Sequence, residues 1–263
     1  MRKNLTNVGL PILLSTVLFI AACGPKDDPQ GAGGAESTPI VVVAEATIEV
    51  QNVMAVKRDI SLDPAKTIDE DSLLVSRYLY EGLVTVDAEG NVQPGIAESW
   101  TISDDELDYI FEINPKARFS DGSRITVDDI TNNFNRWFDP KSPYHGDGNF
   151  PNWLNRFLAF NGERGADDIP VSQVDGVQKV DTNTFIVHLN RLEPQLLTYL
   201  AEPAFAILSP SALENPSYGT RQSTIISSGA YVITSWTDEG MTLTPNPQYW
   251  NTAAEGELKF IWK

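Results

Sequence analysis

Several short segments of the chain alternate hydrophobic with polar residues, a pattern that predicts half-buried β-strands. Other short segments are rich in β-branched residues, which also favour extended structure. The two patterns predict strands at residues 40–43, 50–56, 83–86, 92–94 and 107–113, two strands within residues 177–189 on either side of residues 181–183, and a hairpin formed by residues 229–236 and 241–243. The turn-forming residues 87–91 separate two of these segments and indicate a further β-hairpin.

Apolar residues at helical spacing predict helices at residues 72–83, 126–138 and 194–200. Asp71 or Ser72 is the expected N-cap of the first helix, and Thr126 that of the second. The aromatic- and Gly/Pro-rich stretch 140–152 is predicted to be a loop. Hairpins with interspersed helices favour an α/β fold of the mixed α+β kind.

The N-terminus has the features of an export signal. Arg2 and Lys3 precede a mostly apolar run that is shorter than the ~20 residues of a membrane-spanning helix. We therefore expect residues 1–22 to be a signal peptide. Residues 20–23, Ile-Ala-Ala-Cys, resemble the lipobox of bacterial lipoproteins, whose cysteine is lipidated and becomes the new N-terminus. The resemblance implies a lipid anchor on Cys23, and residues 23–45 read as the anchor and a flexible, polar tether.

Composition narrows the classes of function. The formal charge is −17, so nucleic-acid binding is disfavoured. Cys23 is the only cysteine, so no disulfide can form within the chain. The two histidines, His145 and His188, belong to no metal-ligand spacing, and no nucleophile elbow or phosphate loop is visible. We expect no enzyme, cofactor or metal site. Pairs of acidic residues leave an exported glycan-binding or glycan-hydrolysing lipoprotein open as an alternative.

A series of short motifs resembles one known family. They occur in one order along the chain: Ser61-Leu62-Asp63-Pro64, Tyr80-Glu81-Gly82-Leu83, Pro94 to Trp100, Phe119-Ser120-Asp121-Gly122, Thr126 to Ile130, Asp181 to Phe185, Ser228 to Tyr231 and Asn246 to Trp250. In this order they resemble the N-terminal half of family 5 extracellular solute-binding proteins, the oligopeptide, dipeptide and nickel binders of ABC importers. The resemblance is strongest to the oligopeptide branch.

The resemblance implies a fold and a division into parts. We expect a lobe of the type II periplasmic-binding-protein kind, interrupted by an inserted subdomain. Residues 46–81 and 211–263 would form the incomplete first lobe, and residues 82–210 the insert. Family members are about twice as long as this chain, so the resemblance also implies a fragment whose second lobe is missing. Such a fragment should bind ligand weakly, because half of each enclosing contact is gone.

Ligand contacts are also implied by the resemblance alone. In the family, the segment after the Leu-Asp-Pro motif forms one wall of the cleft, and here that segment is Ile68, Asp69 and Glu70. A tyrosine in a Ser-Pro-Tyr loop contacts ligand in the same relatives, and Tyr144 occupies that position. Residue types at 68–70 depart from the oligopeptide binders, so the wall's position is carried over and not its specificity. The competing interpretation is an acidic loop and helix cap at 68–70, and a self-packed loop aromatic at Tyr144.

The function implied is that of the substrate-binding component of an ABC importer. It would capture short peptides in the periplasmic or extracytoplasmic space and deliver them to permease and ATPase subunits. We expect a monomer held at the membrane by its lipid anchor. A nickel chelate or a sugar remains an alternative ligand.

Overall fold

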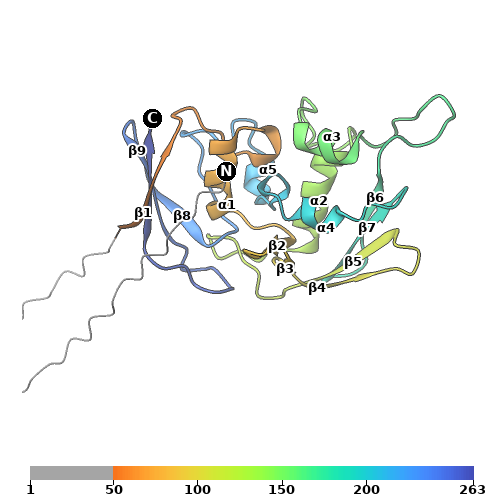
Figure 1. The fold of residues 1–263 in the computed structure, drawn as a ribbon, viewed down its shortest axis with the longest axis horizontal. Helices are drawn as coiled ribbons and strands as arrows, with labels where there is room; N and C mark the ends of the chain where they lie inside the picture. Colours follow the sequence, from red (N-terminus) through yellow and green to blue (C-terminus); the bar gives the residue numbers. More distant parts are fainter. Residues whose placement is uncertain (1–49) are drawn as a thin grey trace, which may run out of the picture. The chain divides into compact units, whose positions relative to one another are not determined.

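The computed structural model describes residues 50–263, which belong to one compact unit (Figure 1). The predicted signal peptide, the lipidated Cys23, the tether and the strand at residues 40–43 all lie outside the described residues. Figure 1 shows one sheet, labelled β1, β8 and β9, on the left and a second, labelled β4 to β7, on the right, with helices between them.

The first sheet has the strand order β1-β10-β9-β8. Its strands are β1 (Val50–Val56), β8 (Tyr231–Trp236), β9 (Gly240–Pro245) and β10 (Glu257–Trp262). β1 runs parallel to β10, whereas the other pairs are antiparallel. Strands from opposite ends of the described chain therefore lie side by side. Leu243 and Phe260 are buried, because alternate residues of their strands point to the inward face of the sheet.

The second sheet has the order β4-β5-β7-β6, with every pair antiparallel. Its strands are β4 (Ala97–Ile102), β5 (Asp108–Ile113), β6 (Val174–Lys179) and β7 (Thr184–Leu189). A separate antiparallel hairpin joins β2 (Val84–Val86) to β3 (Val92–Pro94). Phe185, Val187 and Leu189 are buried, so the predicted alternation in this region is confirmed.

The long helix α2 (Val127–Phe138) forms where its sequence predicts it. Thr126 and Asp129 make a reciprocal capping box, in which each side chain accepts the backbone N–H of the other residue. The shorter helices are α3 (Pro151–Phe157), α4 (Leu196–Leu200), α5 (Pro210–Leu213), and the 3-10 turns η1 (Pro64–Lys66) and η2 (Pro203–Phe205). The predicted loop 140–152 is too long, because α3 begins inside it at Pro151, a residue suited to the first helical position.

Helix α1 (Glu70–Leu79) begins and ends earlier than the predicted range 72–83. Asp69, and not Asp71 or Ser72, is the N-cap, and its side chain accepts the N–H of Ser72. The helix ends because Tyr80 is extended, at φ −130° and ψ 153°.

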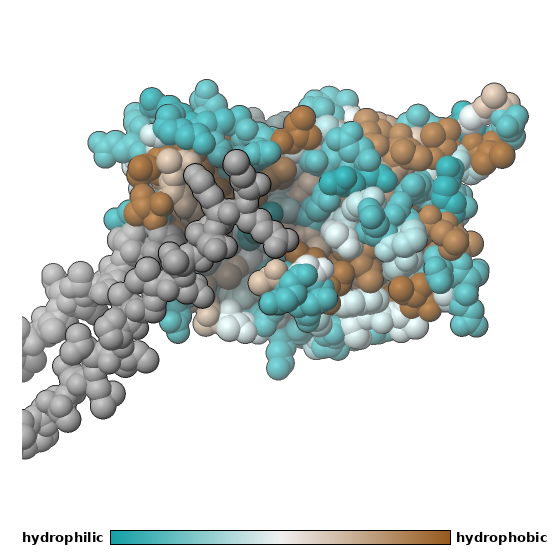
Figure 2. Space-filling view, viewed as in Figure 1, coloured by the Kyte–Doolittle hydropathy of each residue, from teal (hydrophilic) through white to brown (hydrophobic). Residues whose placement is uncertain are grey.

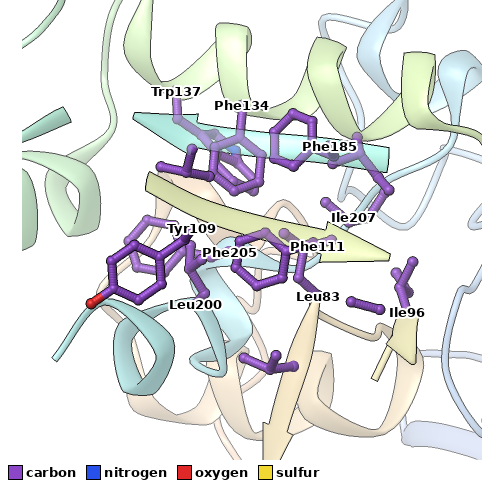
Figure 3. Packing of buried hydrophobic residues seen from close by; sticks show 14 of the residues in the cluster. Leu83, Ile96, Tyr109, Phe111, Phe134, Trp137, Phe185, Leu200, Phe205 and Ile207 are labelled. Atoms are coloured by element: carbon purple, nitrogen blue, oxygen red, sulfur yellow. The ribbon is translucent and has the colours of Figure 1, made fainter. Parts of the chain in front are cut away.

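Two hydrophobic clusters fill the interior. Figure 3 shows part of the first, in which Phe134 of α2 packs against both Trp137 of the same helix and Phe185 of the second sheet. The second cluster joins α1 to the first sheet. The chain enters the first cluster at Ala65, returns to the second in α1 and passes to the first again between Tyr80 and Leu83. Both clusters also hold residues of the segment 205–208. A buried large apolar side chain contributes about 1.5–3 kcal/mol, so both clusters stabilise the fold. The division into a lobe and an inserted subdomain at residues 82 and 210 stays a prediction.

The visible face of the described residues is mostly hydrophilic, with apolar residues in smaller separate groups (Figure 2). Within residues 50–263, none of the helices combines the length and the apolar character needed to cross a bilayer.

Candidate functional site

The segment between η1 and α1 is an exposed stretch of extended backbone. Thr67 ends the 3-10 turn at φ −132° and ψ 146°, and Asp69 has φ −72° and ψ 122°. Ile68 between them exposes 64% of its surface. Within the described part of the chain, neither the N–H nor the C=O of Ile68 takes part in a hydrogen bond. The segment therefore offers a free donor and acceptor to an extended partner.

Asp69 is occupied by structural contacts. One carboxylate oxygen accepts hydrogen bonds from the backbone and hydroxyl of Ser72, and the other lies 2.6 Å from Nζ of Lys57. Burial opposes ionisation of Asp69, but the hydrogen bonds from Lys57 and Ser72 outweigh it and hold the pKa below its ordinary value. Glu70 is exposed in the first turn of α1, where a negative charge is favourable.

Tyr144 lies half-buried in a loop that the structure places beside this segment. Asp147 of the loop forms an ion pair with Lys66, at 3.1 Å. The side-chain amide of Asn152 donates to the carbonyl oxygen of Thr67, at 2.7 Å. Residues that are about 80 positions apart in sequence are thus joined just before the exposed Ile68. The direct contact of Tyr144 with a ligand, like that of residues 68–70, stays a prediction.

A buried ion pair is linked to both the exposed segment at residues 67–69 and the Tyr144 loop. Arg136, in the last turn of α2, donates to both carboxylate oxygens of Asp63, and both residues are almost fully buried. Asp63 belongs to one of the sequence motifs, but its partner Arg136 was not predicted. The available signal was an arginine next to Trp137 on the buried face of α2, because a cation there requires a counter-charge.

The two histidines lie on different elements and share no site. His188 on β7 contacts Asp108 at 2.7 Å and Gln178 at 3.2 Å. His145 is buried in the Tyr144 loop against Phe150 and Phe160, and its Nδ1 donates to the carbonyl of Arg136. Among residues 50–263, no three His, Cys, Asp or Glu side chains gather closely enough to hold a metal ion.

A cavity of about 460 Å³ opens at the other end of α1. Arg77, Glu81 and Tyr249 line it, and the hydroxyl of Tyr249 donates to Glu81 at 2.8 Å. Burial raises the pKa of Glu81 to about 7, although the hydrogen bond from Tyr249 acts in the opposite direction. Because α1 separates Glu81 from Ile68, this cavity is distinct from the predicted ligand wall.

The fold defined by these elements is that of periplasmic binding proteins. The solved structure of the murein tripeptide binding protein MppA of Escherichia coli superposes with a TM-score of 0.64 at 27% sequence identity, over 82% of this chain and 43% of that one. The mixed α/β architecture predicted from the sequence is confirmed.

Sequence comparison shows the family. Residues 91–260 match the model of bacterial extracellular solute-binding proteins, family 5 middle region. The chain therefore belongs to family 5 of the bacterial extracellular solute-binding proteins, as its motifs predicted.

Two curated relatives illustrate the range of the family. The periplasmic oligopeptide-binding protein OppA of Salmonella typhimurium is 31% identical over 96% of this chain and 43% of its own length. The probable deoxycholate-binding periplasmic protein YgiS of Escherichia coli is 31% identical over 72% of this chain and 35% of its own length. The chain thus spans less than half the length of the curated relatives it matches.

Proposed function

We propose that this chain belongs to a substrate-binding protein that captures short peptides outside the cytoplasmic membrane and delivers them to the permease and ATPase of an ABC importer. The observation that carries the proposal is the exposed, unpaired backbone at Ile68 beside the Tyr144 loop, in a member of family 5. An extended peptide can pair with such a segment as an added strand. The protein would act by binding and release, without catalysis.

This mode of recognition explains broad selectivity. Main-chain hydrogen bonds are common to all peptides, so affinity does not depend on one side chain. The printed name of the Salmonella relative, an oligopeptide-binding protein, supports a peptide ligand. The printed name of YgiS shows why the ligand class must be tested, since it describes a bile acid.

Replacing Ile68 with proline should abolish peptide binding, whereas Ile68→Ala should retain it. Proline removes the N–H that a peptide would use, and Thr67 before it already has the extended conformation that a following proline favours. Alanine keeps the N–H and removes only the exposed side chain. Chemical-shift titration with a pool of di- to pentapeptides measures even weak binding by the chain. A second pool with N-methylated backbones should bind less tightly.

Three outcomes would contradict parts of the proposal. Equal binding by the Ile68→Pro and Ile68→Ala variants would place the peptide elsewhere. Binding of a sugar, a nickel chelate or a bile acid, with no response to peptides, would keep the solute-binding role and refute the peptide ligand. Turnover of a glycan by the exported protein would refute the binding role itself.

We also propose that Cys23 carries a lipid and that the mature protein is anchored to a membrane outside the cytoplasm. Cys23→Ala should move the protein from the membrane fraction to the soluble fraction, because no lipid can then be attached. Ser37→Ala, in the tether, is the matched control and should leave the protein at the membrane. Mass spectrometry of the wild-type N-terminus would contradict the proposal if it showed an unmodified Cys23.

A further inference from the structure

The buried ion pair between Asp63 and Arg136 lies directly beneath both parts of the candidate site. Asp63 exposes 6% of its surface and Arg136 exposes 5%. Asp63 immediately precedes η1, and η1 leads into the exposed segment 67–69. A shift of Asp63 would therefore be transmitted to the predicted ligand wall within a single turn of chain.

The same arginine also contacts the Tyr144 loop. Its carbonyl oxygen accepts a hydrogen bond from Nδ1 of His145, the residue after Tyr144, at 2.9 Å. Its guanidinium lies over the ring of Phe150, at 5.3 Å from the ring centroid. Arg136 thus binds the segment before the wall through its side chain, and supports the loop that carries Tyr144 through both its guanidinium and its backbone carbonyl.

Asp63 does not need this ion pair to stay attached to its own side of the molecule. The neighbouring Leu62 donates its N–H to the carbonyl of Gly219, at 2.9 Å. The carbonyl of Leu62 accepts the hydroxyl of Tyr80, which also contacts the hydroxyl of Tyr218. Leu62 belongs to the second hydrophobic cluster, whereas Phe134 and Trp137, which flank Arg136 in the sequence, belong to the first. The ion pair therefore joins a segment anchored in the second cluster to a helix of the first cluster, in which Ala65, two residues after Asp63, also packs.

A buried ion pair contributes little net stability, because the cost of removing both charges from water offsets their attraction. Its two-pronged geometry nevertheless fixes distance and orientation better than an apolar contact does. We propose that Arg136 is a positioning residue that sets the spacing between the wall at residues 67–69 and the Tyr144 loop, so that a peptide meets both. This inference rests on the proposed peptide site, but its central measurement needs no ligand.

Amide hydrogen exchange on the whole chain tests the inference. In Asp63→Asn and in Arg136→Met, exchange should rise by about tenfold or more at Lys66 and Asp69, the hydrogen-bonded amides on either side of Ile68, and in residues 142–150 together. Exchange of amides in β5 and β9 should rise less, because an unpaired buried charge lowers global stability, whereas the two segments also open locally. Arg136→Lys retains the charge but loses the paired donors, so it should restore part of the protection. If Arg136→Met does not fold, Asp63→Asn and Arg136→Lys carry the test.

Arg156→Met is the matched control. Arg156 also pairs with a carboxylate, Glu202 at 2.7 Å, and also lies over an aromatic ring, that of Tyr199. Its loss should leave exchange at Lys66, at Asp69 and in residues 142–150 unchanged. An equal rise in β5, β9 and the two segments in Arg136→Met, or no rise in the two segments, would refute a positioning role.

Peptide titration separates this inference from the proposed function. If the wild type binds peptides, Arg136→Met should weaken binding about tenfold or more while the Arg156→Met control binds normally. If the wild type binds no peptide, the peptide site is refuted, whereas localised exchange in the two segments would still support the bridge formed by Arg136.

Discussion

Replacing Gly219 with alanine should destabilise the fold by about 3–5 kcal/mol, one of the largest effects expected of a single methyl group. Gly219 has φ +85°, a conformation that costs an L-residue about 1–2 kcal/mol. A Cβ at this position would lie 2.3 Å from the backbone nitrogen of Asp63 and 2.8 Å from the carbonyl carbon of Leu62. Backbone atoms cannot rotate away, so the whole Leu62–Asp63 segment must shift.

Gly162→Ala provides the matched control. Gly162 has nearly the same φ, +84°, but no heavy atom lies within 4 Å of a Cβ built there. Its replacement should cost only the free energy of placing an L-residue in this backbone conformation, about 1–2 kcal/mol. Urea unfolding of the two variants and the wild type measures the difference. Equal losses would show that the close approach of Gly219 to Leu62 and Asp63 is unimportant.

Contacts between distant segments, such as that of Gly219 with Leu62 and Asp63, could not be predicted from the sequence. Elements that depend on local patterns could be predicted. Helix α2 was predicted within one residue at each end, because its start depends on Thr126 and Asp129, three positions apart. Strands β5, β6 and β7 of the second sheet were predicted for the same kind of reason, since alternation is a local property, whereas β4 was not predicted. The predicted end of α1 was wrong. The helix ends at Tyr80, whose hydroxyl contacts Tyr218 from a distant part of the chain.

The candidate site also depends on long-range contacts that local sequence patterns do not reveal. Ile68 and Tyr144 were selected by family resemblance, and no local pattern indicated that their segments meet. The contacts that join them, Lys66 with Asp147 and Asn152 with Thr67, each span more than 80 residues of sequence. The ion pair of Asp63 with Arg136 spans 73 residues. Charge and burial patterns indicate that such partners must exist, but only the fold identifies them.

Glu81→Gln should increase stability above neutral pH. The carboxyl of Glu81 lies beside the 460 Å³ cavity, and burial raises its pKa from 4.5 to about 7. The folded chain therefore holds this proton more tightly than the unfolded chain does. The stabilisation from Glu81 is fully present below about pH 4.5 and is lost as the pH rises through about 7. Above that range the folded state carries a poorly solvated charge.

The Glu81→Gln substitution should preserve the hydrogen bonds of residue 81. The side-chain carbonyl of glutamine can still accept the hydroxyl of Tyr249, which now lies 2.8 Å from Glu81. The backbone of residue 81 also keeps its contacts with Ser228 and Ile207, at 3.0 and 2.9 Å. The variant thus removes the titration and preserves the hydrogen bonds.

Urea unfolding at about pH 5 and about pH 8.5 measures the effect. A full shift in pKa would correspond to about 3 kcal/mol, and solvent in the cavity should reduce the gain for Glu81→Gln at the higher pH to about 1–2 kcal/mol. At the lower pH the two proteins should differ little, because Glu81 is then mostly protonated in the folded state. Glu98→Gln, an exposed position on β4, is the control and should show no such difference between the two pH values. A gain of equal size at both pH values would mean that Glu81 is not held protonated by the fold, and that its contact with Tyr249 is formed by the carboxylate.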